Sequence, residues 1–177
     1  LLKQGVGDLD FVLLTHGHSD HTGGFEKVAS EHDIGRLYVP DNSADEGINK
    51  ACEVAKSYGI EIVRISNNCS VQYGDTLFQF IVNNHFFGKT DESDINNASV
   101  VMIAENSDGR AVFTGDIQEE TESYVAENGL FADSEILQVA HHGSNTGSLH
   151  KNISIISPEC AIISDGEKNS YGHPANE

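Results

Sequence analysis

Basic residues are scarce in this sequence. Ten Lys and Arg residues stand against twenty-eight Asp and Glu residues, which gives a formal net charge of −18. A protein that follows the phosphates of a long nucleic acid usually offers them a large basic surface, and this composition argues against one. It leaves room for a nucleic acid substrate at a site where metal ions supply the positive charge locally.

Cysteines and long apolar runs are also few. Cys52, Cys69 and Cys160 form no C-x-x-C pair, which indicates neither a thiolate zinc site nor a disulfide framework, and we expect all three to be buried. No apolar run is long enough to span a membrane, and no signal peptide is recognisable at Leu1. No Walker-type glycine loop is present, and Ser144 lacks the G-x-S-x-G context of a nucleophile.

The 177 residues, 38% of them hydrophobic, suffice for one domain, and no repeat or linker divides them. Alternating and apolar runs predict strands, and 3.6-residue periodicity predicts helices. Strands are expected at 10–15, 36–39, 61–65, 70–73, 76–82, 99–104, 110–114, 135–140 and 161–164. Helices are expected after residue 24, at 46–57 and at 119–127, and a polar loop at 83–97. This order favours two sheets with helices outside them, as a single domain over residues 1–177.

The most informative segment is 15–21, Thr-His-Gly-His-Ser-Asp-His. It follows the apolar run 11–14, so its side chains lie where a buried strand ends. Three imidazoles and one carboxylate, from His16, His18, Asp20 and His21, are ligands that suit zinc, iron or manganese.

Three further ligand-type groups also follow predicted strands. Asp116 follows 110–114, the pair His141 and His142 follows 135–140, and His173 lies beyond 161–164. Such side chains converge at one edge of a sheet, and a carboxylate such as Asp116 can bridge two cations roughly 3.5–4 Å apart. The sequence does not decide between His141 and His142; we favour His141 as the ligand, because it comes first after the strand.

The sequence gives less support for a role of other polar residues in the site. His85 follows a strand and is a less favoured additional ligand, because a long polar loop comes after it. His32 and His150 are expected to face solvent. Ser144 is expected to donate a hydrogen bond to a substrate oxygen or to cap a turn. Asp116 and His173 also have simpler readings, as parts of ordinary surface turns.

Five segments together resemble a known family: THGHSDHTGG, NNASVVM, FTGDI, VAHHGS and YGHP. Their order is similar to that of the metallo-β-lactamase superfamily, and most of all to the hydrolase domain of ComEC-type competence proteins and its free-standing relatives. The resemblance runs from about residue 11 to residue 174. It implies an α/β fold, the metallo-β-lactamase-like αββα sandwich of two mixed sheets with helices outside. It also implies two divalent metal ions, most often zinc, with manganese or iron as alternatives.

Carried over by position, the resemblance implies six metal ligands: His16 and His18 at one metal, Asp20 and His21 at the other, Asp116 between them, and His141 completing the second site. The candidate catalytic residues are Asp20, His142 and His173. Two features depart from the family pattern. A middle-loop histidine is missing unless His85 supplies it, so the metal at His16 and His18 is expected to bind less tightly. The family's opening strands do not precede residue 11, so the domain is expected to be incomplete at its N-terminus.

The resemblance implies a metal-dependent hydrolase. In the expected reaction, a water bridging the two metals has its pKa lowered to about 7, attacks phosphorus or a carbonyl carbon as hydroxide, and His173 or His142 protonates the leaving group. The preferred substrate is a phosphodiester, possibly single-stranded DNA. The alternatives are a small or cell-surface ester of the phosphorylcholine, lactone or lactam type, and a non-catalytic metal-binding module. The expected setting is a bacterial cell surface or its exterior, with the cytoplasm as an alternative.

Overall fold

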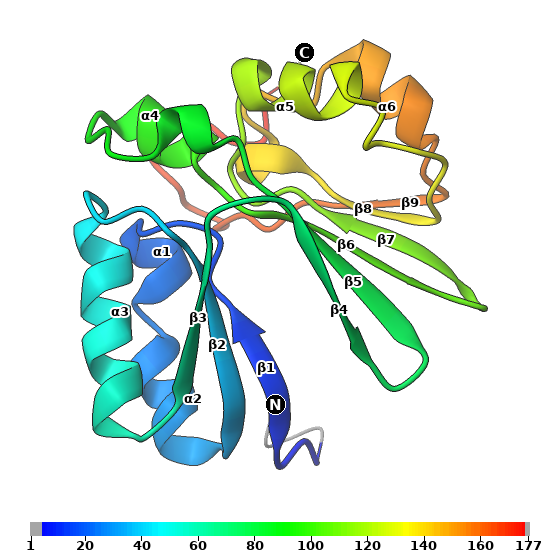
Figure 1. Cartoon of the computed structure of the whole chain (residues 1–177). Coiled ribbons are helices and arrows are strands. Elements are labelled where there is room, and N and C mark those ends of the chain that lie inside the picture. Colours follow the sequence, from blue (N-terminus) through cyan, green and yellow to red (C-terminus); the bar gives the residue numbers. More distant parts are fainter. Residues whose placement is uncertain (1–4, 176–177) are drawn as a thin grey trace.

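The computed structural model describes residues 5–175 as two β-sheets packed face to face between two layers of helices (Figure 1). This is the αββα sandwich that the sequence predicted. Within the described part of the chain, no helix combines the length and apolar character that crossing a membrane would require.

The first sheet is parallel throughout, in the order β1-β2-β3, and is not mixed as the resemblance implied, because a helical crossover joins each pair of its strands. Its strands and the helices that connect them are β1 (Leu9–Leu13), α1 (Ser19–Thr22), α2 (Phe25–Glu31), β2 (Ile34–Pro40), α3 (Glu46–Ser57) and β3 (Glu61–Ile65). Helix α3 forms where the sequence predicts it, because its apolar residues recur every three or four positions. Its N-terminus is capped by Asp45, whose side chain accepts the N–H of Ile48 at 3.1 Å.

The second sheet has six strands in the order β4-β5-β6-β7-β8-β9. Their bounds are β4 (Cys69–Tyr73), β5 (Thr76–Ile81), β6 (Val101–Asn106), β7 (Gly109–Phe113), β8 (Ile136–Gln138) and β9 (Cys160–Ile162). β4 to β7 pair antiparallel, and β7, β8 and β9 pair parallel. Helices α5 (Glu119–Glu127) and α6 (His150–Ile156) cover its outer face (Figure 1).

Aromatic side chains join the two sheets. Phe80 of β5 is fully buried, and its ring centroid lies 4.9 Å from that of Tyr38 on β2. Phe11 of β1 meets Tyr38 edge-on, with 5.4 Å between the ring centroids. Burying a side chain of this size contributes about 2–3 kcal/mol to folding. The packing therefore fixes the end of β1 beside the second sheet, where the backbone N–H of Val100 also bonds to the carbonyl of Thr15 at 3.0 Å.

The segment 83–97 is not the polar loop that its sequence suggested. It contains a short 3₁₀ helix, η2 (Asn84–Phe86), and α4 (Glu92–Asn97). Asn96 and Asn97 are buried, and the Asn97 side-chain oxygen accepts the N–H groups of Gln118 and Thr121 at the start of α5. The buried face of α4 is thus held by hydrogen bonds to α5 and not by apolar contacts, so the apolar periodicity that predicts helices is missing from its sequence. Helix α6 was likewise not predicted.

Two expectations about single residues were wrong. His32 is buried rather than solvent-facing, because its Nδ1–H donates to the carbonyl of Gly7 at 2.7 Å. Cys69 and Cys160 are exposed because they lie on β4 and β9, the two edge strands of the second sheet. Cys52 is buried, as predicted.

Candidate metal centre

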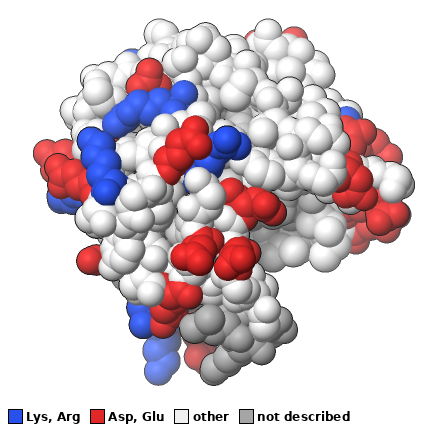
Figure 2. Space-filling view, turned by 60° about the horizontal axis from the view of Figure 1, so that its bottom comes forward, with Lys and Arg blue, Asp and Glu red and all other residues white. Residues whose placement is uncertain are grey.

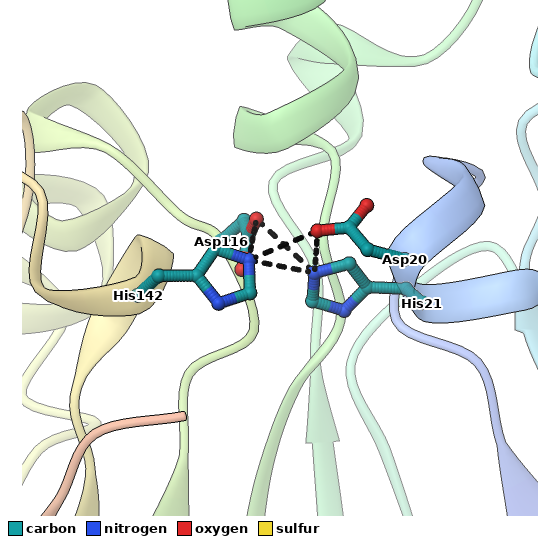
Figure 3. Close-up of side chains that lie close together, drawn as sticks. All are labelled: Asp20, His21, Asp116 and His142. Carbon is teal, nitrogen blue, oxygen red and sulfur yellow. Dashed lines mark hydrogen bonds and ion pairs between the residues drawn. The ribbon is translucent and has the colours of Figure 1, made fainter. Parts of the chain in front are cut away.

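Asp20, His21, Asp116 and His142 bring one ligand atom each into a group in which all atoms lie within 4.8 Å of one another (Figure 3). Nε2 of His142 is 3.1 Å from Oδ2 of Asp20 and 3.3 Å from Oδ2 of Asp116. Nε2 of His21 is 3.2 Å from the same Asp116 oxygen and 3.3 Å from Nε2 of His142. Two carboxylates and two imidazoles around one point are a ligand set that divalent transition metals favour.

The four residues reach this point from three segments that follow strands. Asp20 and His21 lie on α1, just beyond β1; Asp116 lies beyond β7; and His142 lies in the 3₁₀ segment η3 (Ala140–Gly143) beyond β8. Because β7 and β8 are parallel neighbours, their following loops emerge at the same edge of the sheet. The structure thus brings the strand ends together, but it does so from both sheets, because β1 belongs to the first sheet, and not at one edge of a single sheet as expected from the sequence.

The first ligand loop is pressed against the start of α3. A Cβ on Gly17 would lie 1.6 Å from Oδ1 of Asp45, and a Cβ on Gly47 would lie 1.8 Å from the carbonyl oxygen of Gly17. Only glycine fits at these contacts. Thr22 adds a hydrogen bond from its hydroxyl to the carbonyl of His18 at 3.1 Å. The backbone that carries His18, Asp20 and His21 is therefore held in one place.

The loop that carries Asp116 is fixed by Gln138 on the neighbouring strand. The side-chain oxygen of Gln138 accepts the N–H groups of Thr114 at 3.0 Å and of Gly115 at 2.9 Å. Gly115 has a φ of +57°, and a Cβ there would lie only 3.1 Å from the side chain of Thr15. Asp116 therefore sits on a turn with little freedom to move.

The buried carboxylate of Asp116 provides a place for a cation. Asp116 is 2% exposed, and its Oδ1 has no hydrogen-bond partner among the described residues. Burial alone would raise its pKa, but the hydrogen bond from His21 and the nearby His16 and His142 outweigh it and lower the pKa to about 2. An ionised, buried oxygen without a donor costs free energy unless a cation is close to it. The residues of this site therefore fit a bound metal ion.

His16 and His18 lie beside the four-residue group, and His16 is near the same Asp116 oxygen as His21 and His142. Nε2 of His16 is 3.8 Å from Oδ2 of Asp116 and 3.1 Å from Nδ1 of His18, while its Nδ1 is 3.1 Å from the hydroxyl of Thr15. His16 is fully buried, and this burial holds its pKa well below the ordinary value, so the ring is neutral. A neutral imidazole is the form that binds metals. Fewer protein ligands meet here than at the four-residue group.

The side chains of His141 and His142 point to different partners. Both residues have left-handed backbones, with φ of 49° and 56°, which is costly for residues other than glycine. Nδ1–H of His142 donates to the carbonyl of Ser164 at 2.7 Å, which leaves the Nε2 lone pair aimed at the group. His141 instead places Nδ1 2.9 Å from the Thr146 hydroxyl and Nε2 3.5 Å from the amide nitrogen of Asn96. The structure thus brings His142, not His141, into the four-residue group; the ligand role assigned to His141 stays a prediction.

The group opens into a cavity of about 770 Å³. His141, Ser144 and His173 line it together with the ligand-type residues, and His85 is exposed elsewhere. Several residues at this site were not among those predicted from the sequence, including Glu92, Asn96, Ser164, Asp165, Asn169 and Tyr171. Asn96 belongs to the NNASVVM segment, so that segment was the signal that could have identified it.

Comparisons with known proteins agree with this architecture. The family model described as "Beta-lactamase superfamily domain" matches residues 2–146. The chain is 30% identical to ComE operon protein 3 of Bacillus subtilis over 98% of its own length, and 30% identical to competence protein ComA of Neisseria gonorrhoeae over 96%. It spans only 22% of each of these two relatives.

A solved structure shares the fold. CmlA, a diiron β-hydroxylase from Streptomyces venezuelae, superimposes with a TM-score of 0.57 at 13% identity, over 87% of this chain and 34% of CmlA. At that identity the likeness concerns the fold alone. With the family match, the two sheets between helices and the ligand-bearing strand ends, the chain belongs to the β-lactamase superfamily and has the metallo-β-lactamase fold.

Proposed function

We propose that this chain is a metal-dependent hydrolase that cleaves phosphodiesters. The observation that carries the proposal is the buried Asp116 carboxylate. One of its oxygens has no partner among the described residues, and the other lies 3.2 and 3.3 Å from the Nε2 atoms of His21 and His142. Such a site serves little structural purpose without a cation, and in this superfamily the cation supports hydrolysis.

Asp20, His21, Asp116 and His142 would hold one metal, and His16 and His18 would hold a second that shares Asp116. Zinc is the preferred metal because imidazole and carboxylate ligands suit it, with manganese or iron as alternatives. Divalent metals at such sites lower the pKa of water to about 7 and neutralise charge on a substrate oxygen.

The chain's own residues orient these ligands and the substrate. The carbonyl of Ser164 fixes the tautomer of His142 by accepting its Nδ1–H. Thr146 and Asn96 hold His141 at the cavity wall. His173 lines the same cavity outside the four-residue group, so we assign it, rather than His142, as the proton donor to the leaving group.

The scarcity of basic side chains favours a phosphodiester that contacts the protein only at the site and not along an extended surface. None of the described residues that line the cavity is Lys or Arg. Figure 2 shows a face on which Lys and Arg lie in separate groups beside Asp and Glu and form no continuous track. A short single strand or a small phosphodiester suits a cavity without basic side chains in its described lining, and the small diester of phosphorylcholine type is the second candidate, favoured by the acidic Glu92 and Asp165 in the cavity.

The test compares substrates, metals and one ligand variant. Wild type loaded with zinc or manganese is expected to cleave oligothymidylate or a small diester such as glycerophosphocholine, and Asp116→Asn is expected to be at least about 1,000-fold slower. Asp133→Asn, an exposed aspartate outside the site, is the matched control and should keep wild-type activity. Unchanged activity of Asp116→Asn, or no cleavage of any diester with either metal, would contradict the proposal.

A further inference from the structure

One residue at the cavity wall has no part in the chemistry described so far. Tyr171 lines the same cavity as Asp116 and His142, yet its side chain is 78% exposed. Among the described residues that line the cavity, it is the single Phe, Tyr or Trp. A large ring displayed to solvent beside a reactive site is a surface for another flat or apolar group.

The loop that displays Tyr171 is held together by one side chain. The side-chain oxygen of Asn169 accepts the N–H groups of Tyr171 at 3.1 Å and His173 at 3.0 Å. Its amide nitrogen donates to the carbonyl of His173 at 2.8 Å and to Asp165 at 3.0 Å. These bonds close the loop on itself and fix the backbone on both sides of the ring.

The same loop is attached to the segment that carries His142. Ser164, just before the loop, accepts the Nδ1–H of His142, and the N–H of Ala175, just after it, donates to the carbonyl of Gly143 at 2.8 Å. A Cβ on Gly143 would lie 2.8 Å from Pro174, so the two segments are in close contact. Tyr171 is therefore placed at a set position relative to the candidate metal ligands.

The ring of His173 lies beside the ring of Tyr171 and almost parallel to it. The two ring centroids lie 5.9 Å apart, with 14° between the ring planes. The two nearly parallel rings do not surround a space between several aromatic faces. A quaternary ammonium group is usually bound by several aromatic rings that surround it. A nucleobase needs only one flat face on which to stack.

Charge alone does not select the ligand of this cavity, whose described lining includes the acidic Glu92 and Asp165. Because no Lys or Arg lines it, a nucleic acid strand gains little there from contacts between phosphates and basic side chains. Stacking on an aromatic side chain gives a factor of about 5 to 150 in affinity per base and does not depend on basic residues.

We propose that Tyr171, held by Asn169 beside His173, stacks on a nucleobase next to the phosphodiester that is cleaved. This rests on the proposed phosphodiesterase function. Tyr171 acts here as a binding residue and takes no part in the chemistry, so its loss changes KM more than kcat.

The test uses the metal-loaded protein and two oligonucleotides, an oligothymidylate and the same strand with abasic residues. Tyr171→Ala is expected to raise KM for the oligothymidylate about 10-fold and to leave KM for the abasic strand unchanged. Tyr171→Phe should behave like wild type because it keeps the ring. Tyr58→Ala, which removes an exposed tyrosine outside this cavity, is the control and should have no effect.

Failure of stacking and failure of the phosphodiesterase proposal give different results. If wild type cleaves both strands and Tyr171→Ala changes KM equally for both or for neither, the stacking proposal is overturned while the phosphodiesterase stands. A raised KM of Tyr171→Ala for glycerophosphocholine alone also overturns it, in favour of a cationic headgroup. If no diester is cleaved, the Kd for labelled oligothymidylate from fluorescence anisotropy decides, and equal Kd values for wild type and Tyr171→Ala overturn stacking.

Discussion

Nε2 of His142 lies 3.3 Å from Oδ2 of Asp116, although the two residues follow different strands of the second sheet. The pairing of Phe113 on β7 with Gln138 on β8 sets this proximity, since it aligns the ends of the two strands. The left-handed backbone at His141 and His142 then turns the second imidazole, and not the first, towards Asp116.

The first prediction separates the two adjacent histidines. His142→Ala is expected to weaken zinc binding by more than about 100-fold, because it removes a ligand rather than a group that orients one. His141→Ala is expected to keep the zinc, because the ring of His141 faces Thr146 and Asn96. Zinc content after dialysis and affinity by competition with a chelator measure both. A variant pair with the reverse order of affinities would show that His141 is the ligand.

The second prediction concerns the contact between the ligand loop and α3. Gly17→Ala is expected to lower the free energy of unfolding by about 2–3 kcal/mol, because the new methyl group overlaps the carboxylate of Asp45. Urea unfolding measures the change. Gly7→Ala is the matched control, since nothing lies within 4 Å of the added Cβ, and it should stay within about 0.5 kcal/mol of wild type. Equal stability of the two variants would mean that the loop and α3 are not tightly packed.

The third prediction concerns pH. Glu122 on α5 is buried, and its oxygens accept the N–H of Leu149 at the start of α6 at 3.1 and 3.0 Å. Burial raises its pKa in the folded state above 4.5, despite these hydrogen bonds. As pH rises, the unfolded chain therefore loses this proton first, and the stabilisation present at low pH is lost as pH passes the folded pKa.

The Glu122→Gln variant makes this effect measurable because its side chain does not ionise. The stability of wild type relative to the variant is expected to fall when pH rises from about 4 to about 7. Glu119→Gln, on the exposed start of the same helix, controls for the loss of one charge. A stability difference that stays constant or grows with pH would contradict the raised pKa of Glu122.

The sequence predicts best those elements whose local pattern agrees with their packing. The bounds of α3 match because Asp45 caps it and Ile48 and Ala55 recur on its buried face. Helix α4 could not be seen in this way, since Asn96 and Asn97 form its buried face and make polar contacts with other segments. Apolar periodicity carries no signal for such a face.

The same limit applies to the site. That His16, His18, Asp20, His21 and Asp116 meet was predictable, because strand ends converge. It was not predictable which of His141 and His142 faces Asp116. The direction of a side chain after a strand can be inferred only while the backbone stays extended, and both residues have a left-handed φ. The display of Tyr171 likewise depends on the Asn169 hydrogen bonds, which join residues in an irregular loop.

Everything proposed for this site depends on a metal ion bound by Asp20, His21, Asp116 and His142. Anomalous diffraction at the zinc edge from crystals of zinc-loaded protein tests this binding most directly. One strong peak is expected within bonding distance of all four side chains, and a weaker second peak is expected beside His16 and His18. A zinc-loaded crystal with no peak among the four side chains would contradict it.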